Sequence, residues 1–357
     1  MLYFAIMALT VWLLGMTPPK YGLRQNNYKN YLILAGLVIV LITGLRSPYT
    51  GTGDNVSYIN SFDILSTYSS FSRYYDLWLS GKDFLVAESG FYFFTWILAR
   101  IFDNGQILLV ATMAVTTYAV CRFIHINSDD PPTSLLIYVC LGLLTFNMNG
   151  MRQAMAMSVC LFAYEYAKKQ KLIPFVLIVL LAMQFHKSAI CFLPVFILPA
   201  FKEGKGNIFF FMCLMSVFLL NVENFIGAFN DMTGKNYELQ DESTGGGITV
   251  VMIYAVAVLL PIFVKNSLKN REIRTAYCAV LLGFVCYISR YFTNQILERV
   301  SYYFVYFVIL LIPMLISRLD PKERNIIKYI FSGCCILLLV YRIMSGAFAD
   351  YTLFFLD

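Results

Sequence analysis

Charged side chains are scarce in this sequence. Asp, Glu, Lys and Arg make up 13% of its 357 residues, whereas soluble domains contain about 25%. Apolar residues reach 59%. This composition excludes an ordinary soluble enzyme and is typical of a membrane protein that crosses the bilayer several times.

Histidine is also rare, and the cysteines lack any pairing pattern. His125 and His186 are the only histidines, which rules out a histidine-rich metal site. The nine cysteines are odd in number, lie in apolar stretches and show no C-x-x-C spacing. We therefore expect small core side chains rather than a disulfide framework. The net charge of +6 indicates topology in such a protein rather than a nucleic-acid partner.

Apolar runs are abundant and predict an all-α fold with about 12 transmembrane helices. A span needs about 20 mostly apolar residues, so the chain has room for a single transmembrane domain over 1–357 and for no large soluble one. The first run has no basic segment before it and no small-residue cleavage site after it, so it predicts a span rather than a signal peptide. The predicted spans are 2–16, 31–45, 106–123, 134–148, 151–167, 172–186, 188–200, 207–222, 248–264, 275–291, 300–317 and 326–345.

Clusters of lysine and arginine predict the orientation of these spans, because such clusters mark cytoplasmic loops. All of the clusters lie in the cytoplasm if the spans alternate and if the stretch 91–102 does not cross. That stretch has only twelve residues and contains Arg100, so we predict a re-entrant or interfacial helix there. Both termini and the two long loops, 46–90 and 223–247, then face outward.

Polar residues gather at the external ends of the predicted spans. Snorkelling to lipid head groups explains Arg46 or Lys187 singly, and Asp54 suits a turn. An arginine within apolar sequence, such as Arg152, costs about 2.5–3.5 kcal/mol at the bilayer centre and usually faces a cavity or a ligand. Independent snorkelling would scatter such residues over both leaflets, so their gathering on one side predicts an outward-facing site. The candidate residues are Arg46, Asp54, Tyr58, Glu88, Asn149, Arg152, Gln153, His186, Lys187, Arg290, Glu298 and Arg299.

These residue types suit glycosyl transfer from a lipid-linked oligosaccharide. Arginine binds phosphate oxygens in bidentate fashion, and a polyprenyl pyrophosphate presents such an anion at head-group depth while its tail lies among the membrane lipids. The reaction needs charge neutralisation on the departing pyrophosphate and a base for the attacking hydroxyl. His186 is the first candidate for that catalytic base, followed by Asp54 and Glu88. The other nine residues are candidates for substrate binding, with Arg152 first as a pyrophosphate ligand.

A set of motifs from Arg46 to Phe304 resembles the EpsG family of Wzy-like polysaccharide polymerases. Gly53 stands where that family commonly has a threonine, just before the aspartate. The motifs are G-L-R at 44–46, G-x-G-D-x-x-x-Y at 51–58, E-x-G-F at 88–91, N-x-x-R-Q-x-x-A at 149–156, F-H-x-S-A at 185–189 and E-R-x-x-Y-Y-F at 298–304.

The resemblance implies a GT-C-like enzyme of bacterial capsule or exopolysaccharide assembly in the plasma membrane. Such polymerases transfer a growing chain, linked to polyprenyl pyrophosphate, onto a newly flipped lipid-linked repeat unit. The resemblance also implies that no nucleotide sugar, metal or other cofactor is needed, and that a flippase and a chain-length regulator are partners.

Two other functions stay open. A lipid-linked oligosaccharide flippase is less favoured because the chain shows no two-half repeat and its polar residues favour one leaflet. A membrane O-acyltransferase is less favoured because no cytoplasmic loop is polar enough to hold a donor.

Overall fold

A computed structural model describes most of the chain. Its described residues are 2–16, 24–51, 54–73, 88–201, 248–292, 296–344, 346 and 348–356, together with 221, 224, 227, 228 and 231. The predicted span 207–222 and the predicted loop 223–247 lie almost wholly outside the described residues. Two parts of the loop 46–90, residues 52–53 and 74–87, also lie outside them.

The described part of the chain is all α-helical, as the sequence predicts, with three short 3-10 helices and no β-strand. The helices are α1 (Leu2–Met16), α2 (Arg24–Gly44), α3 (Asp54–Ser66), α6 (Ser89–Ile101), α7 (Gln106–Asn127), α8 (Pro131–Cys140), α9 (Leu143–Asn149), α10 (Met151–Lys168), α11 (Leu172–Met183), η1 (Lys187–Phe196), η2 (Leu198–Ala200), α14 (Ile248–Phe263), η3 (Ser267–Lys269), α15 (Arg271–Ser289), α16 (Ile296–Val305), α17 (Val308–Ile316) and α18 (Pro321–Met344).

Three described helices, α7, α15 and α18, are long and apolar enough to cross a membrane. Two bent pairs, α8–α9 and α16–α17, raise this number to five if each pair forms one span. Five further apolar segments of the described chain are shorter. The helices therefore support a multi-pass membrane protein, whereas a total of about 12 spans stays a prediction.

Three predicted spans differ from the structure in form. The run 134–148 is divided into α8 and α9, which meet at 53° next to Gly142, where the backbone φ is +94°. The run 300–317 begins earlier, at Ile296, and bends by 41° between α16 and α17. The run 188–200 is not an α-helix but the 3-10 helices η1 and η2, because Pro194 and Pro199 lack the N–H that continues an α-helix.

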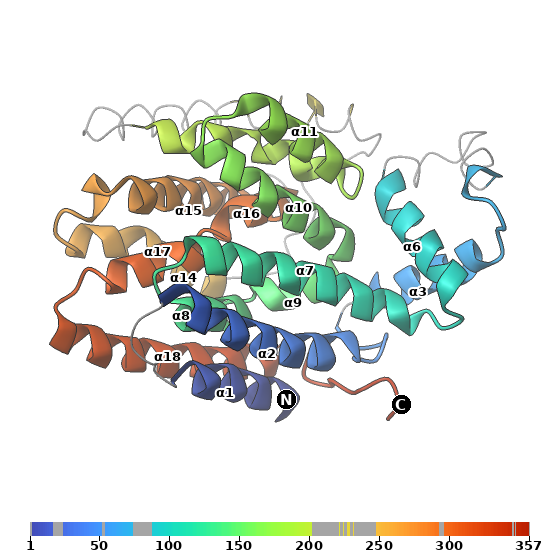
Figure 1. The fold of residues 1–357 in the computed structure, drawn as a ribbon, viewed down its shortest axis with the longest axis horizontal. Helices are drawn as coiled ribbons and strands as arrows, with labels where there is room; N and C mark the ends of the chain where they lie inside the picture. The colour runs from blue at the N-terminus through green and yellow to red at the C-terminus, as the bar shows by residue number, and fades with distance from the viewer. Residues whose placement is uncertain are drawn as a thin grey trace.

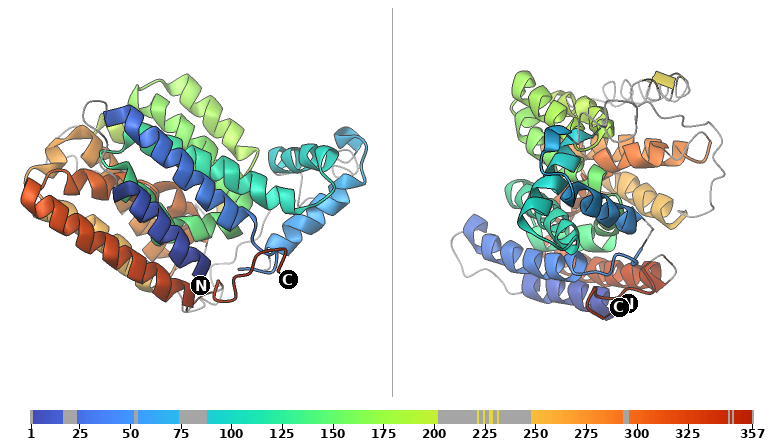
Figure 2. Two further views of the ribbon diagram at one scale, coloured as in Figure 1. Left: turned by 60° about the horizontal axis from the view of Figure 1, so that its bottom comes forward. Right: turned by 90° about the vertical axis from the view of Figure 1, so that its right-hand side faces the viewer.

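The predicted re-entrant or interfacial helix 91–102 corresponds to α6. Its 13 residues reach about 20 Å, which is less than the roughly 30 Å of a bilayer core. Figure 1 places α3 and α6 together at the end of the bundle where α7 begins. The C-terminus lies toward that same end, whereas the N-terminus lies nearer the middle of the long axis (Figures 1 and 2). The external location of the termini stays a prediction, and α3 was not foreseen within the loop 46–90.

The C-terminal segment 348–356 folds back onto the loop that follows α2. The Ser47 N–H donates to the Thr352 carbonyl at 3.0 Å, and the Phe354 N–H donates to the Leu45 carbonyl at 3.0 Å. Phe348 of this segment is buried. The C-terminal segment and the loop after α2 are thereby held together.

Candidate active site

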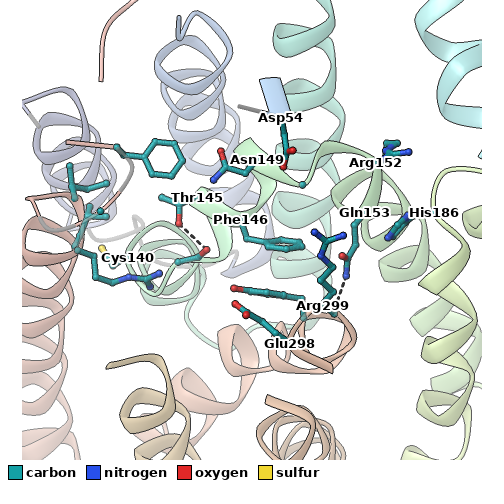
Figure 3. A pocket seen from close by; sticks show the side chains of 18 of the residues that line it. Asp54, Cys140, Thr145, Phe146, Asn149, Arg152, Gln153, His186, Glu298 and Arg299 are labelled. Carbon is teal, nitrogen blue, oxygen red and sulfur yellow. Dashed lines mark hydrogen bonds between the residues drawn. The ribbon is translucent and has the colours of Figure 1, made fainter. Parts of the chain in front are cut away.

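A cavity of about 490 Å³ opens where α3, α9, α10, α16 and α18 meet. Eight of the twelve predicted site residues line it (Figure 3). They are Asp54, Tyr58, Asn149, Arg152, Gln153, His186, Glu298 and Arg299. These residues, distant in the sequence, therefore line one cavity, and their roles stay predictions.

Glu88 does not line the cavity but connects two residues that do. Its side chain is 4% exposed. Its Oε2 accepts a hydrogen bond from Arg152 Nη1 at 2.6 Å, and its Oε1 contacts His186 Nδ1. The N-terminus of α6 thus supplies a buried carboxylate that holds an arginine from α10 and the histidine that precedes η1.

This contact determines the form of the His186 ring. A carboxylate can only accept hydrogen bonds, so the Nδ1 that faces Glu88 carries the proton. In the neutral ring Nε2 then carries the lone pair. His186 lines the cavity, and its side chain is 12% exposed. The arrangement is suited to a general base whose tautomer is fixed by a buried acid.

Arg290 and Glu298 form a second ion pair, at the α15–α16 side of the cavity. Arg290 Nη1 donates to Glu298 Oε2, and the guanidinium lies over the rings of Tyr287 and Tyr291 at 5.2 and 4.9 Å. Glu298 lines the cavity, whereas Arg290 does not. Because Arg290 is only 8% exposed and lies beside Glu298, it chiefly neutralises that carboxylate.

Two further predicted residues, Arg46 and Lys187, lie outside the cavity lining. Arg46 is fully buried. Its guanidinium donates to the carbonyl oxygens of Thr43 and Met148, both at 2.6 Å, and to Asn55 Oδ1 at 2.9 Å. Burial lowers the pKa of Arg46 to about 10, so it remains charged at neutral pH. These contacts join the end of α2 to α3 and α9. Lys187 is half-buried at the start of η1.

Asn149 and Tyr58 occupy the cavity wall near α3. Gly51 has a φ of +90°, and a Cβ there would lie 2.5 Å from Asn149 Oδ1, so glycine allows the loop before α3 to approach α9 this closely. Arg152 lies 5.9 Å from the centroid of the Tyr58 ring. Burial raises the pKa of Tyr58 although Arg152 lowers it, so this hydroxyl stays neutral.

Comparison with protein families identifies the chain. The sequence model of the EpsG family matches residues 29–355. The chain belongs to the EpsG family. Comparisons with curated proteins and with solved structures found no match, so the GT-C-like fold stays a prediction. Membership is consistent with a Wzy-like polysaccharide polymerase in general terms.

Several residues of this EpsG-family cavity were missed in the sequence. Arg342 of α18 lines it, and the signal that singled out Arg152, an arginine within an apolar run, was present there too. Phe146 and Tyr302 also line it. Their rings stack at 3.8 Å between centroids with 16° between planes, a pairing that no sequence spacing reveals.

The described residues contain no group of three or more His, Cys, Asp or Glu side chains that could hold a metal ion. All eight described cysteines are free thiols, and seven of them are buried. Cys213 lies outside the described residues. Seven described cysteines thus serve as core side chains, as the sequence predicts, whereas Cys334 is exposed.

Proposed function

We propose that this chain is a polysaccharide polymerase that transfers a polyprenyl-pyrophosphate-linked glycan chain onto a new lipid-linked repeat unit at the outer face of a bacterial plasma membrane. The observation that carries the proposal is the cavity itself. In an EpsG-family chain, it brings the Glu88–His186 pair together with Arg152 and Arg299.

In this proposal the donor diphosphate binds near Arg152 and Arg299. The Arg299 side chain is exposed in the cavity, while its carbonyl accepts a hydrogen bond from Gln153 Nε2 at 2.6 Å. Arg152 lines the cavity, so phosphate oxygens bind its guanidinium there while it stays paired with Glu88. Two guanidinium groups bound to one diphosphate stabilise the negative charge that develops on it as it departs.

The acceptor hydroxyl is then deprotonated by His186. Its Nε2 takes the proton, the hydroxyl oxygen bonds to the anomeric carbon of the donor, and the bond from that carbon to the diphosphate oxygen breaks. Glu88 stabilises the imidazolium that forms and keeps the ring oriented. Asp54, which is exposed on the cavity wall, is the alternative base.

The stacked pair Phe146–Tyr302 supplies an aromatic face for sugar rings. A polymerase of this kind would receive its substrate from a flippase, and a chain-length regulator would act with it. No metal or cofactor takes part in the proposed steps.

A deletion strain tests this function. We expect it to accumulate single lipid-linked repeat units that are already external and to regain polymer when the wild-type chain is supplied. His186→Gln should fail to restore polymer, whereas the matched variant His125→Gln should succeed, because His125 lies in the last turn of α7 and does not line the cavity. Units retained on the cytoplasmic face would indicate a flippase instead. Normal polymer that lacks only acyl groups would indicate an acyltransferase.

A further inference from the structure

Arg342, near the C-terminal end of α18, lines the cavity but forms no ion pair with a described residue. Its Nη1 is buried and has no hydrogen-bond partner in the described part of the chain. Arg342 is therefore a charged hydrogen-bond donor whose Nη1 has no acceptor among the described residues.

The backbone beneath this guanidinium is shaped to admit it. Gly142 lies at the break between α8 and α9 with a φ of +94°, and a Cβ there would lie 2.2 Å from Arg342 Nη1. Only glycine both adopts this φ readily and leaves that space. Thr145 Oγ1 donates to the Gly142 carbonyl at 3.0 Å, which occupies that carbonyl. The bend between α8 and α9 thus leaves space in which the Arg342 guanidinium packs against Gly142.

Three of the other arginines near the cavity differ in this respect. Arg152 is paired with Glu88, and Arg290 with Glu298, while Arg46 donates to carbonyl and amide oxygens. Arg342 is half-buried, and a partly buried cation without a counter-charge costs free energy. A compensating anion brought by a ligand removes that cost, since bidentate guanidinium–oxyanion pairs are strong.

The position of Arg342 separates it from the proposed reaction centre. Arg342 lies against Gly142, which falls between Cys140 and Thr145 in the sequence, and all four residues line the cavity. Figure 3 shows Cys140 and Thr145 on one side of Phe146, and Arg152, Gln153 and His186 on the other. The aromatic pair Phe146–Tyr302 lies in the lining between these regions. An anion at Arg342 would therefore be distinct from the departing diphosphate.

We propose that Arg342 and the Gly142 bend form a second anion subsite, which binds an anionic group carried by a lipid-linked saccharide. This inference rests on the proposed function, since it assigns a second contact to the substrate of the same cavity. The ligand group is an oxyanion that accepts hydrogen bonds from the Arg342 guanidinium. Two sources offer it: an acidic sugar of the repeat unit, or the diphosphate of a carrier lipid.

The test measures binding to the purified full-length chain in lipid nanodiscs. The probes are repeat units isolated from the deletion strain, the same units after chemical reduction of their carboxylates, and undecaprenyl diphosphate alone. The variants are Arg342→Gln, Arg342→Lys and the control Lys322→Gln, which removes an exposed positive charge from the same helix. We expect Arg342→Gln to weaken binding of native repeat units about 10- to 100-fold, Arg342→Lys to recover only part of it, and the control to match the wild type.

The remaining probes assign the source of the anion. If it is a sugar carboxylate, carboxyl reduction abolishes the difference between wild type and Arg342→Gln, and undecaprenyl diphosphate binds both alike. If the anion is a carrier diphosphate, Arg342→Gln weakens the binding of undecaprenyl diphosphate about as much as it weakens the binding of native repeat units. Equal affinity of wild type and Arg342→Gln for all three probes would overturn the subsite.

Thermal unfolding without ligand separates binding from a structural role. Because Arg342 Nη1 has no described partner, Arg342→Gln should leave Tm equal to or above that of the wild type. A clear fall in Tm would show that Arg342 supports the fold and would overturn the proposal. These measurements need no turnover, so a wild-type chain that fails to polymerise would refute the proposed function while binding still decides the subsite.

Discussion

Replacing Glu88 by glutamine removes the carboxylate that connects Arg152 and His186. The side chain keeps its size, but Arg152 loses the counter-charge at 2.6 Å, and the acceptor for His186 Nδ1 becomes neutral. Removing one partner of a fully buried ion pair costs about 3–5 kcal/mol. Arg152 is 19% exposed, so we expect a loss of unfolding free energy nearer to about 1.5–3 kcal/mol.

The kinetic effect should be larger and confined to turnover. Disturbing the acid that orients a catalytic histidine costs about 10⁴-fold in serine proteases, and a positioned general base contributes about 10²–10⁴-fold. We therefore expect kcat of Glu88→Gln to fall about 10²–10⁴-fold. KM for the donor should stay constant or decrease, because Arg152 is then available to the diphosphate.

The assay is polymer formation by the purified protein with isolated lipid-linked repeat units, followed as initial rates over a range of donor concentrations. Glu165→Gln is a matched control, because Glu165 pairs with Lys168 at 3.4 Å in the last turns of α10 and does not line the cavity. A raised KM with unchanged kcat would refute the reasoning, since it would make Glu88 a substrate contact rather than a positioning residue.

Four further predictions follow from the same contacts. Arg152→Lys should remain at least about tenfold impaired in polymer synthesis, because lysine keeps the charge but lacks the bidentate fork; near-normal synthesis would make Arg152 a simple counter-charge. His186→Gln should stay folded and bind donor, yet lose about 10²-fold or more in rate; full activity would transfer the role of base to Asp54. Arg46→Met should lower Tm through its lost bonds to Thr43, Asn55 and Met148 without a selective rise in donor KM, whereas an unchanged Tm with a raised KM would assign it to substrate binding. Asp103→Cys should react with an impermeant thiol reagent on intact cells and Asn127→Cys should not, because α7 separates the two positions; labelling of position 127 alone would contradict the orientation.

Hydropathy was enough to predict many of the helices, because burial in lipid requires long apolar runs. The runs 2–16, 151–167 and 326–345 correspond closely to α1, α10 and α18. The bend at Gly142 was not predicted, since an isolated glycine in an apolar run is compatible with a continuous helix. Helix α3 was also missed, because its sequence is largely polar and carries no long apolar run.

Residue type alone singled out eight of the side chains that line the cavity, whereas the pairing of charged residues was not predicted. Arginine and histidine at the ends of apolar runs indicated an anion site, and the cavity brings Arg152 and His186 together. That Glu88 would contact both depends on a tertiary approach across 64 and 98 residues. Arg46 carried the same sequence signal as Arg152, yet packing placed it among backbone carbonyls instead of in the cavity.

The central claim is tested most directly by reconstitution of the purified chain into liposomes that contain lipid-linked repeat units as the sole saccharide. We expect a ladder of polymer lengths, with one polyprenyl diphosphate released for each glycosidic bond formed. The ladder should disappear with His186→Gln and persist with His125→Gln. Movement of repeat units across the bilayer without any new glycosidic bond would contradict the account.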